Sequence, residues 1–198
     1  MGKIFYIMGK SASGKDHIYE RLLADAELGL QPLVSCTTRP MRAGEEDGRE
    51  YWFMDEAALE ELRTAGKIIE ERTYDTVHGR WHYFTADDGR IDPGRFDYLA
   101  IGTLESYGKM RRCFGADVMV PVYIEVRDDI RLLRAVQRER KQTEPRYEEL
   151  CRRFLADSED FSEEKIAEAG IGRRFENNAD FDTCFQNVVG WIKEHKRA

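Results

Sequence analysis

The sequence has no long hydrophobic run, and no apolar stretch approaches the ~18 to 20 residues that a membrane-spanning helix requires. Its first ten residues, MGKIFYIMGK, also lack the extended apolar stretch of a secretory signal. We therefore expect a cytoplasmic protein without a membrane partner.

Cysteine is scarce, with four residues in a chain of 198. The four stand far apart, without a CxxC pair or a histidine at metal-ligand spacing: Cys36, Cys113, Cys151 and Cys184. This spacing argues against a zinc site and against a redox pair. We expect reduced cysteines that take no part in the chemistry.

Basic residues are in the minority, because 31 Lys and Arg against 38 Asp and Glu give a formal net charge of −7. A negative balance disfavours non-specific binding to nucleic acid, so no nucleic-acid partner is expected. The hydrophobic share of 41% is enough for the core of one α/β domain.

Short apolar runs alternate with helical patterns along the chain. The expected strands cover residues 3–8, 33–37, 51–54, 68–74, 81–85, 97–101, 119–126 and 174–177, with a hairpin turn at His78-Gly79. The main expected helices cover residues 15–25, 56–65, 103–113 and 182–196. This alternation predicts an α/β fold with a mostly parallel sheet flanked by helices.

A glycine-rich segment directly follows the first expected strand and precedes the first helix. It reads Gly9-Lys10-Ser11-Ala12-Ser13-Gly14-Lys15 and satisfies the pattern GxxxxGK. Glycines let backbone N–H groups wrap around an anion, and the start of a helix adds the positive end of its dipole. We predict a nucleotide phosphate-binding loop formed by Gly9, Ser11, Ala12, Ser13, Gly14, Lys15 and Asp16. Lys15 would reach the β- and γ-phosphates and take part in catalysis.

Position 16 departs from the phosphate-loop pattern, which has Ser or Thr there to ligate Mg²⁺. The carboxylate of Asp16 can also bind Mg²⁺, directly or through water, although it places negative charge beside the phosphates. Asp16 is therefore a candidate metal ligand. The alternative is that it only favours the first turn of the helix.

A second candidate anion site lies in the segment from Ser35 to Tyr51. Arg39 and Arg42 stand three residues apart on a loop with Pro and Gly, so their guanidinium groups can converge on one phosphate. Tyr51 adds a hydroxyl group. Taken alone, such a segment is more typical of a solvated loop balanced by its own acids.

Three features together resemble the guanylate kinases, the nucleoside monophosphate kinases that phosphorylate GMP. They are the phosphate loop, the segment S-x-T-T-R-P-x-R-x-G-E-x-D-G-x-x-Y and the acid in Ile69-Glu70. The similarity is plain over about residues 1–75 and weaker beyond them. It implies a P-loop NTPase-type fold whose GMP-binding subdomain spans 33–86 and whose helical lid spans 137–147, with a core of 1–32, 87–136 and 148–198.

The resemblance also implies the roles of individual side chains. The GMP phosphate would be held by Arg39, Arg42, Tyr51 and Tyr83, and guanine would face Ser35, Glu70 and Thr85. Guanine presents N1–H and N2–H₂ as adjacent donors that one carboxylate accepts, whereas adenine would leave Glu70 unpaired. From the lid, Arg138 or Arg140 and also Arg153 would reach the transferring phosphoryl group, because this reaction requires positive charge and alignment.

One departure from the family concerns the end of the third core strand. Guanylate kinases usually carry Asp-x-Asp there, one acid near the magnesium and one near the guanine, but this chain has Ala100-Ile101-Gly102. Since one carboxylate appears at Asp16 where others are lost, we hypothesise that Asp16 takes over part of the magnesium ligation.

The activity implied is Mg²⁺-assisted phosphorylation of GMP or dGMP to GDP, with ATP as the donor substrate. Two alternatives stay open. One is a related P-loop kinase with a different small-molecule or nucleotide acceptor, and the other is an inert guanylate-kinase-like binding module. The sequence does not indicate an oligomeric state.

Overall fold

The structure of the chain is a computed structural model that describes residues 1–76 and 79–196. His78, where the sequence predicts a turn, lies outside the described residues. Within the described part, no helix is long and apolar enough to cross a membrane.

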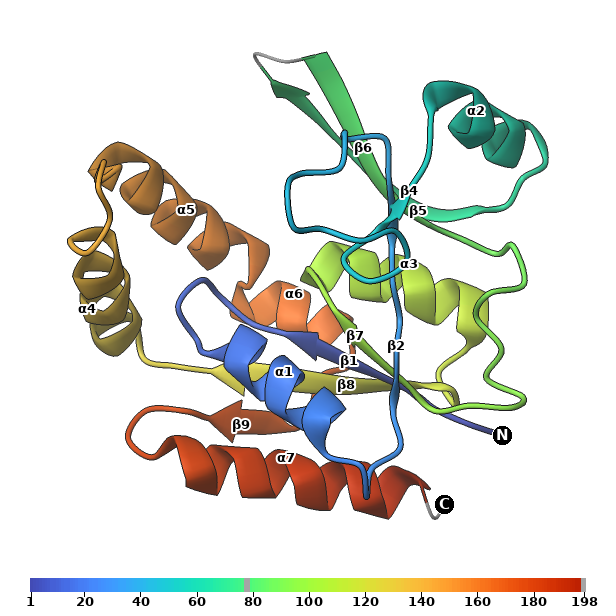
Figure 1. Cartoon of the computed structure of the whole chain (residues 1–198). Coiled ribbons are helices and arrows are strands. Elements are labelled where there is room, and N and C mark those ends of the chain that lie inside the picture. The colour runs from blue at the N-terminus through green and yellow to red at the C-terminus, as the bar shows by residue number, and fades with distance from the viewer. Residues whose placement is uncertain (77–78, 197–198) are drawn as a thin grey trace.

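The larger of the two sheets has five strands in the order β2-β7-β1-β8-β9 (Figure 1). These are β1 (Ile4–Met8), β2 (Gln31–Pro32), β7 (Tyr98–Ile101), β8 (Met119–Glu125) and β9 (Arg174–Glu176). Each neighbouring pair is parallel, which confirms the predicted parallel sheet. The carboxyl ends of β1 and β7 therefore meet at one edge, where ligands bind in open α/β sheets.

Helices cover both faces of this sheet because β1 is apolar on both sides. Phe5 and Ile7 pack in one cluster with α1 (Lys15–Ala24) and α7 (Phe181–Lys196). Ile4, Tyr6 and Met8 pack in another with α3 (Leu104–Phe114) and α6 (Glu163–Glu168). The four free cysteines divide evenly, with Cys36 and Cys184 buried and Cys113 and Cys151 exposed.

The smaller sheet has four strands in the order β4-β3-β6-β5 and stands beside the larger one (Figure 1). Its strands are β3 (Cys36–Thr37), β4 (Trp52–Phe53), β5 (Ile68–Thr76) and β6 (Gly79–Ala86). Leu59 of α2 (Glu56–Thr64) packs on Phe84 and Cys36 to form a small separate core. Asp55 caps α2, accepting a hydrogen bond from the N–H of Ala58 at 2.8 Å.

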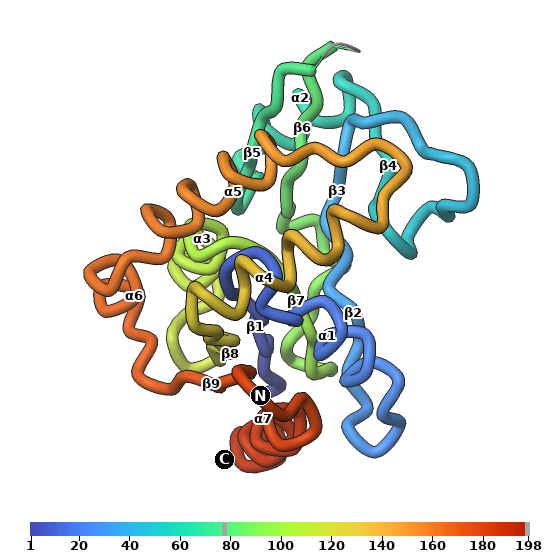
Figure 2. Tube along the Cα trace, turned by 90° about the vertical axis from the view of Figure 1, so that its left-hand side faces the viewer, coloured from blue at the N-terminus to red at the C-terminus, as the bar shows by residue number. Residues whose placement is uncertain are grey.

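The remaining helices, α4 (Asp128–Glu139) and α5 (Tyr147–Asp160), form a hairpin that we call the α4–α5 hairpin. Both views place it on the side where β1 leads into α1 (Figures 1 and 2). The fully buried Arg131 of α4 ties the two helices together through Asp157, Ser158 and the carbonyl of Phe154. The lid range expected from sequence, 137–147, covers the end of α4, the connecting loop and the first residue of α5.

Candidate active site

The glycine-rich loop between β1 and α1 has a backbone that two of its positions can adopt only as glycine. A Cβ at Gly9 would lie 2.5 Å from the carbonyl oxygen of Ile124. Gly14 has φ +86, and a Cβ there would lie 2.6 Å from Nδ2 of Asn177. The chain thus wraps tightly before α1 begins, as an anion-binding loop requires.

Several hydrogen-bond donors of this loop are available to bind a ligand. Gly14 caps α1 without a side-chain acceptor, so the first N–H groups of the helix point outward beside its positive dipole end. The hydroxyl of Ser13 is buried and has no hydrogen-bond partner among the described residues. Directly after β9, the buried Asn177 donates its side-chain amide to the carbonyl of Ser13 at 2.8 Å and so supports the loop.

Lys15 and Asp16 open α1, and their charged ends lie 3.9 Å apart. The Asp16 side chain is 76% exposed, and its neighbour Lys15 is the cation paired with it. Its position is open to a metal ion carried by a nucleotide.

One loop amide is already occupied by a side chain that the sequence did not single out. The N–H of Ser11 donates to Oδ2 of Asp157 at 2.8 Å, and Arg131 donates to the same oxygen at 3.2 Å. Asp157 is one acid among several on an amphipathic helix, so no local signal could have identified it.

The smaller sheet gathers the predicted phosphate ligands of the acceptor. Arg39 is only 3% exposed, and Glu45 accepts two of its hydrogen bonds, at 2.8 and 3.0 Å. These bonds lower the pKa of the Glu45 carboxyl. The guanidinium group lies 5.5 Å from the ring of Tyr51, which in turn contacts Tyr83 at 5.4 Å. Arg42 is exposed, and its backbone N–H donates to Glu45 at 2.7 Å.

The predicted base ligands meet next to this cluster. Glu70 on β5 pairs in register with Thr85 on β6, and the Thr85 hydroxyl donates to Oε1 of Glu70 at 3.0 Å. The hydroxyls of Ser35 and Thr85 are 3.4 Å apart. Ser106 of α3, which the sequence analysis did not select, donates to Oε2 of Glu70 at 2.8 Å.

A cavity of about 160 Å³ lies between the phosphate loop and the α4–α5 hairpin, where Ser11 forms part of the wall. Arg138 and Arg153 line it, together with Arg131 and Arg146, two cations that the sequence analysis did not select. Arg140 ends α4, is exposed and stands outside this lining. The structure therefore brings Arg138 and Arg153 to the loop.

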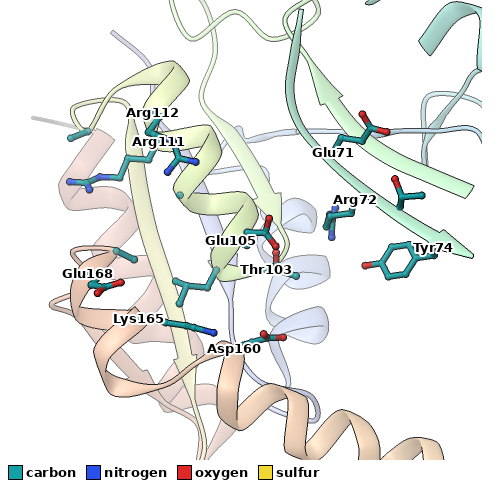
Figure 3. A pocket seen from close by; sticks show the side chains of 15 residues that line it. Glu71, Arg72, Tyr74, Thr103, Glu105, Arg111, Arg112, Asp160, Lys165 and Glu168 are labelled. Atoms are coloured by element: carbon teal, nitrogen blue, oxygen red, sulfur yellow. The ribbon is translucent and has the colours of Figure 1, made fainter. Parts of the chain in front are cut away.

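A larger cavity, of about 1150 Å³, lies between β5, the start of α3 and the junction of α5 with α6 (Figure 3). Its wall includes Arg72 and Tyr74 of β5, Thr103 and Glu105 of α3, and Lys165 of α6. This volume is sufficient for a nucleotide-sized ligand.

Comparison with known proteins identifies relatives of the region that carries both anion sites. The family model described as guanylate kinase matches residues 1–82. The guanylate kinase of Bordetella pertussis is 42% identical over 91 residues, covering 46% of this chain and 40% of that protein. The guanylate kinase of Chromobacterium violaceum is 34% identical over 103 residues, covering 51% and 47%. Residues 1–82 are thus similar in sequence to guanylate kinases.

The remaining part of the chain resembles a guanylate kinase in its fold. The chain matches 40% of the length of the Bordetella relative, about two fifths. A crystal structure of guanylate kinase from Anaplasma phagocytophilum covers 100% of this chain and 87% of its own, with a TM-score of 0.65 at 16% identity. The guanylate kinase fold, a P-loop NTPase fold, therefore extends beyond residue 82.

Proposed function

We propose that this protein transfers the γ-phosphoryl group of ATP to GMP, giving ADP and GDP. The observation that carries the proposal is the arrangement on one face of the smaller sheet. Tyr83 and Thr85 stand two residues apart on β6 and so point to the same side. Tyr83 belongs to the cluster of Arg39 and Tyr51, which suits a phosphate. Thr85 belongs to the cluster around the Glu70 carboxylate, which suits guanine.

The donor nucleotide would bind at the loop of residues 9–16. Its phosphates would accept hydrogen bonds from loop N–H groups and from the Ser13 hydroxyl, which is buried without a partner in the described chain. Lys15 would neutralise charge on the β- and γ-phosphates.

Mg²⁺ fits the donor set at this loop when it arrives with ATP. Within residues 1–76 and 79–196, no three His, Cys, Asp or Glu side chains form a metal-binding group. Magnesium in kinases is commonly held by one or two carboxylates together with substrate phosphates, and the exposed Asp16 supplies one carboxylate. Bound there, the ion would neutralise charge that develops on the transferring group.

The α4–α5 hairpin would provide the remaining positive charge. Arg138 and Arg153 line the cavity beside the loop and would contact the phosphoryl group during transfer, with Arg140 further away. We propose that the lid, 137–147, and the subdomain, 33–86, close over the nucleotides. Closure would exclude water, which otherwise competes as the acceptor. The nucleotide substrates are consistent with a cytoplasmic location.

A coupled ADP-release assay tests the proposal, using ATP, Mg²⁺ and a panel of GMP, dGMP, AMP, CMP and UMP. We expect turnover on GMP and dGMP. The Arg39→Ala variant should lower kcat/KM for GMP at least 100-fold, because two hydrogen bonds from a charged group are worth about 3 kcal/mol or more. Arg49→Ala is the matched control, since Arg49 lies on the same loop but is 52% exposed.

Each result separates the readings of the site. If Arg39→Ala phosphorylates GMP as well as the wild type does, the acceptor does not bind at the predicted site. Turnover on none of the five nucleotides, with ATP still bound, would mean that the acceptor is another small molecule. Failure to bind ATP would indicate a binding module.

A further inference from the structure

The base end of the acceptor site contains a cation that the proposed function does not use. Arg72 stands two residues after Glu70 on β5, so both side chains point to the same face of the sheet. Its Nε lies 3.3 Å from Oε2 of Glu70. The guanidinium end lines the 1150 Å³ cavity, opposite the start of α3 (Figure 3).

The Nε–H group of Arg72 is a spare donor. Nε is buried, and the described chain offers it no acceptor with hydrogen-bond geometry, although the two charges attract at this distance. A buried donor without a partner costs about 1–3 kcal/mol, which a ligand acceptor would recover. The opposite charge of Glu70 nevertheless raises the pKa of Arg72 against the effect of burial, so the group stays a cation.

Glu70 retains acceptor capacity of its own. A carboxylate has about four lone-pair sites. The Ser106 hydroxyl takes one on Oε2 and the Thr85 hydroxyl takes one on Oε1. One site on each oxygen is left, which is the number that two adjacent N–H groups of a base require.

The space next to this pair is closed by an uncharged group. A Cβ at Gly102 would lie 2.1 Å from the hydroxyl oxygen of Tyr6. The Tyr6 hydroxyl therefore fills the position where a side chain at 102 would begin. Burial and the charge of Glu70 raise the pKa of Tyr6, so its hydroxyl stays neutral. Tyr6 therefore adds no charge beside Glu70 and Arg72, and Glu105 is a further charged group in the wall of the same cavity.

We propose that Arg72 is a specificity-determining residue that donates its Nε–H to a carbonyl oxygen on the acceptor base. Together with Glu70 it offers one donor beside two acceptors, complementary to the O6, N1–H and N2–H₂ edge of guanine. Hypoxanthine shares O6 and N1–H. Adenine presents an amino group in place of O6, so the donor of Arg72 would face another donor. This inference rests on the proposed function.

The test compares kcat/KM for GMP, IMP and AMP in wild-type protein and in Arg72→Ala, Arg72→Lys and Glu70→Gln. Arg72→Ala should lower the values for GMP and IMP together by about 10- to 100-fold, the size of one hydrogen bond from a charged donor. The AMP value should not fall, and the GMP-to-IMP ratio should stay within about twofold of wild type. Glu70→Gln should instead lower that ratio, because IMP lacks N2–H₂.

The Arg72→Lys variant separates base recognition from charge balance. Lysine keeps a cation beside the buried Glu70 and should keep the melting temperature near wild type, but it lacks the Nε–H group. We expect it to lose selectivity for GMP over AMP as Arg72→Ala does. Arg80→Ala is the matched control, because Arg80 lies on β6, the strand paired with β5, and is 66% exposed. It should leave kcat/KM for all three substrates unchanged.

Two results would overturn the role of Arg72. Wild-type selectivity in Arg72→Lys would mean that the Nε–H group is not required and that a cation at this position suffices. An equal fall for GMP, IMP and AMP in every Arg72 variant would mean that it supports the fold or the phosphate site. If the wild type binds GMP without phosphorylating it, the proposed function fails, and the same ratios measured as Kd by calorimetry still decide on Arg72. If it binds none of the three, both fail.

Discussion

Replacing Asp157 by asparagine should make the protein bind ATP more tightly. Asp157 accepts a hydrogen bond from the Ser11 N–H, one of the loop donors expected to hold ATP phosphates. Its carboxylate and an incoming phosphate carry like charge and compete for the same donor. Asparagine keeps an oxygen of similar position and removes the charge.

The size of the effect follows from the bonds that change. A hydrogen bond to a charged acceptor contributes about 1.5–3 kcal/mol, and a neutral one about 0.5–1.5 kcal/mol. The difference of about 1–1.5 kcal/mol corresponds to roughly a tenfold lower Kd for ATP. Arg131 would lose one charged partner but keep Asp128 at 2.6 Å. The variant should therefore fold, with a lower melting temperature.

Titration calorimetry with MgATP, without an acceptor, measures the change directly. Glu159→Gln is the matched control, because Glu159 lies on the same helix, is exposed and loses the same charge. A folded Asp157→Asn protein that binds ATP as the wild type does, or more weakly, would refute competition at Ser11. An equal gain in ATP affinity in both variants would mean that the effect comes from the lost negative charge at long range and not from the Ser11 contact.

Three further predictions concern the loop and the smaller sheet. Asp16→Ala should raise the magnesium concentration needed for half-maximal activity several-fold, whereas Asp16→Ser should restore it; unchanged magnesium dependence in both would exclude Asp16 as a ligand. Gly14→Ala should abolish ATP binding measured by calorimetry, because its φ of +86 and the contact at 2.6 Å from Asn177 exclude a Cβ. Hydrogen bonds from Arg63, and then from His82, lower the pKa of Glu71 below its ordinary 4.5, so its contribution to stability is present above that pH and lost as the pH falls below it. Urea unfolding of Glu71→Gln should thus show a deficit at pH 7 that disappears in acid, and a deficit independent of pH would contradict this.

The features that sequence predicted well are those encoded by neighbouring residues. The glycine loop has its own steric signature, and apolar runs such as Ile4–Met8 specify buried strands without reference to the rest of the chain. The pairing of Glu70 with Thr85 depends on tertiary structure, and there the family resemblance provided information that periodicity alone does not contain.

The features that the sequence analysis missed are pairs formed by distant segments. Asp157 and Ser11 are 146 residues apart, and Ser106 and Glu70 are 36 apart. Gly102 seemed only to be the loss of an acid, but the hydroxyl of Tyr6 from another strand occupies the space that it leaves. Such compensation has no local pattern, because each residue is ordinary where it stands in the chain.

The two ends of the site carry charges of different sign. Where the family pattern has an acidic pair, this chain has Ala100 and Gly102, and Arg72 adds a cation beside Glu70. At the phosphate loop two acids are present, since Asp16 stands where the pattern has Ser or Thr and Asp157 holds the Ser11 N–H. The lack of acids at positions 100 and 102 makes an acceptor carbonyl easier to bind, while the acids at the loop weaken binding of free ATP and favour ATP that carries Mg²⁺. The dependence of ATP binding on Mg²⁺ should therefore be steeper in the wild type than in Asp157→Asn. Equal dependence in the two proteins would mean that Asp157 does not affect how Mg²⁺ promotes ATP binding.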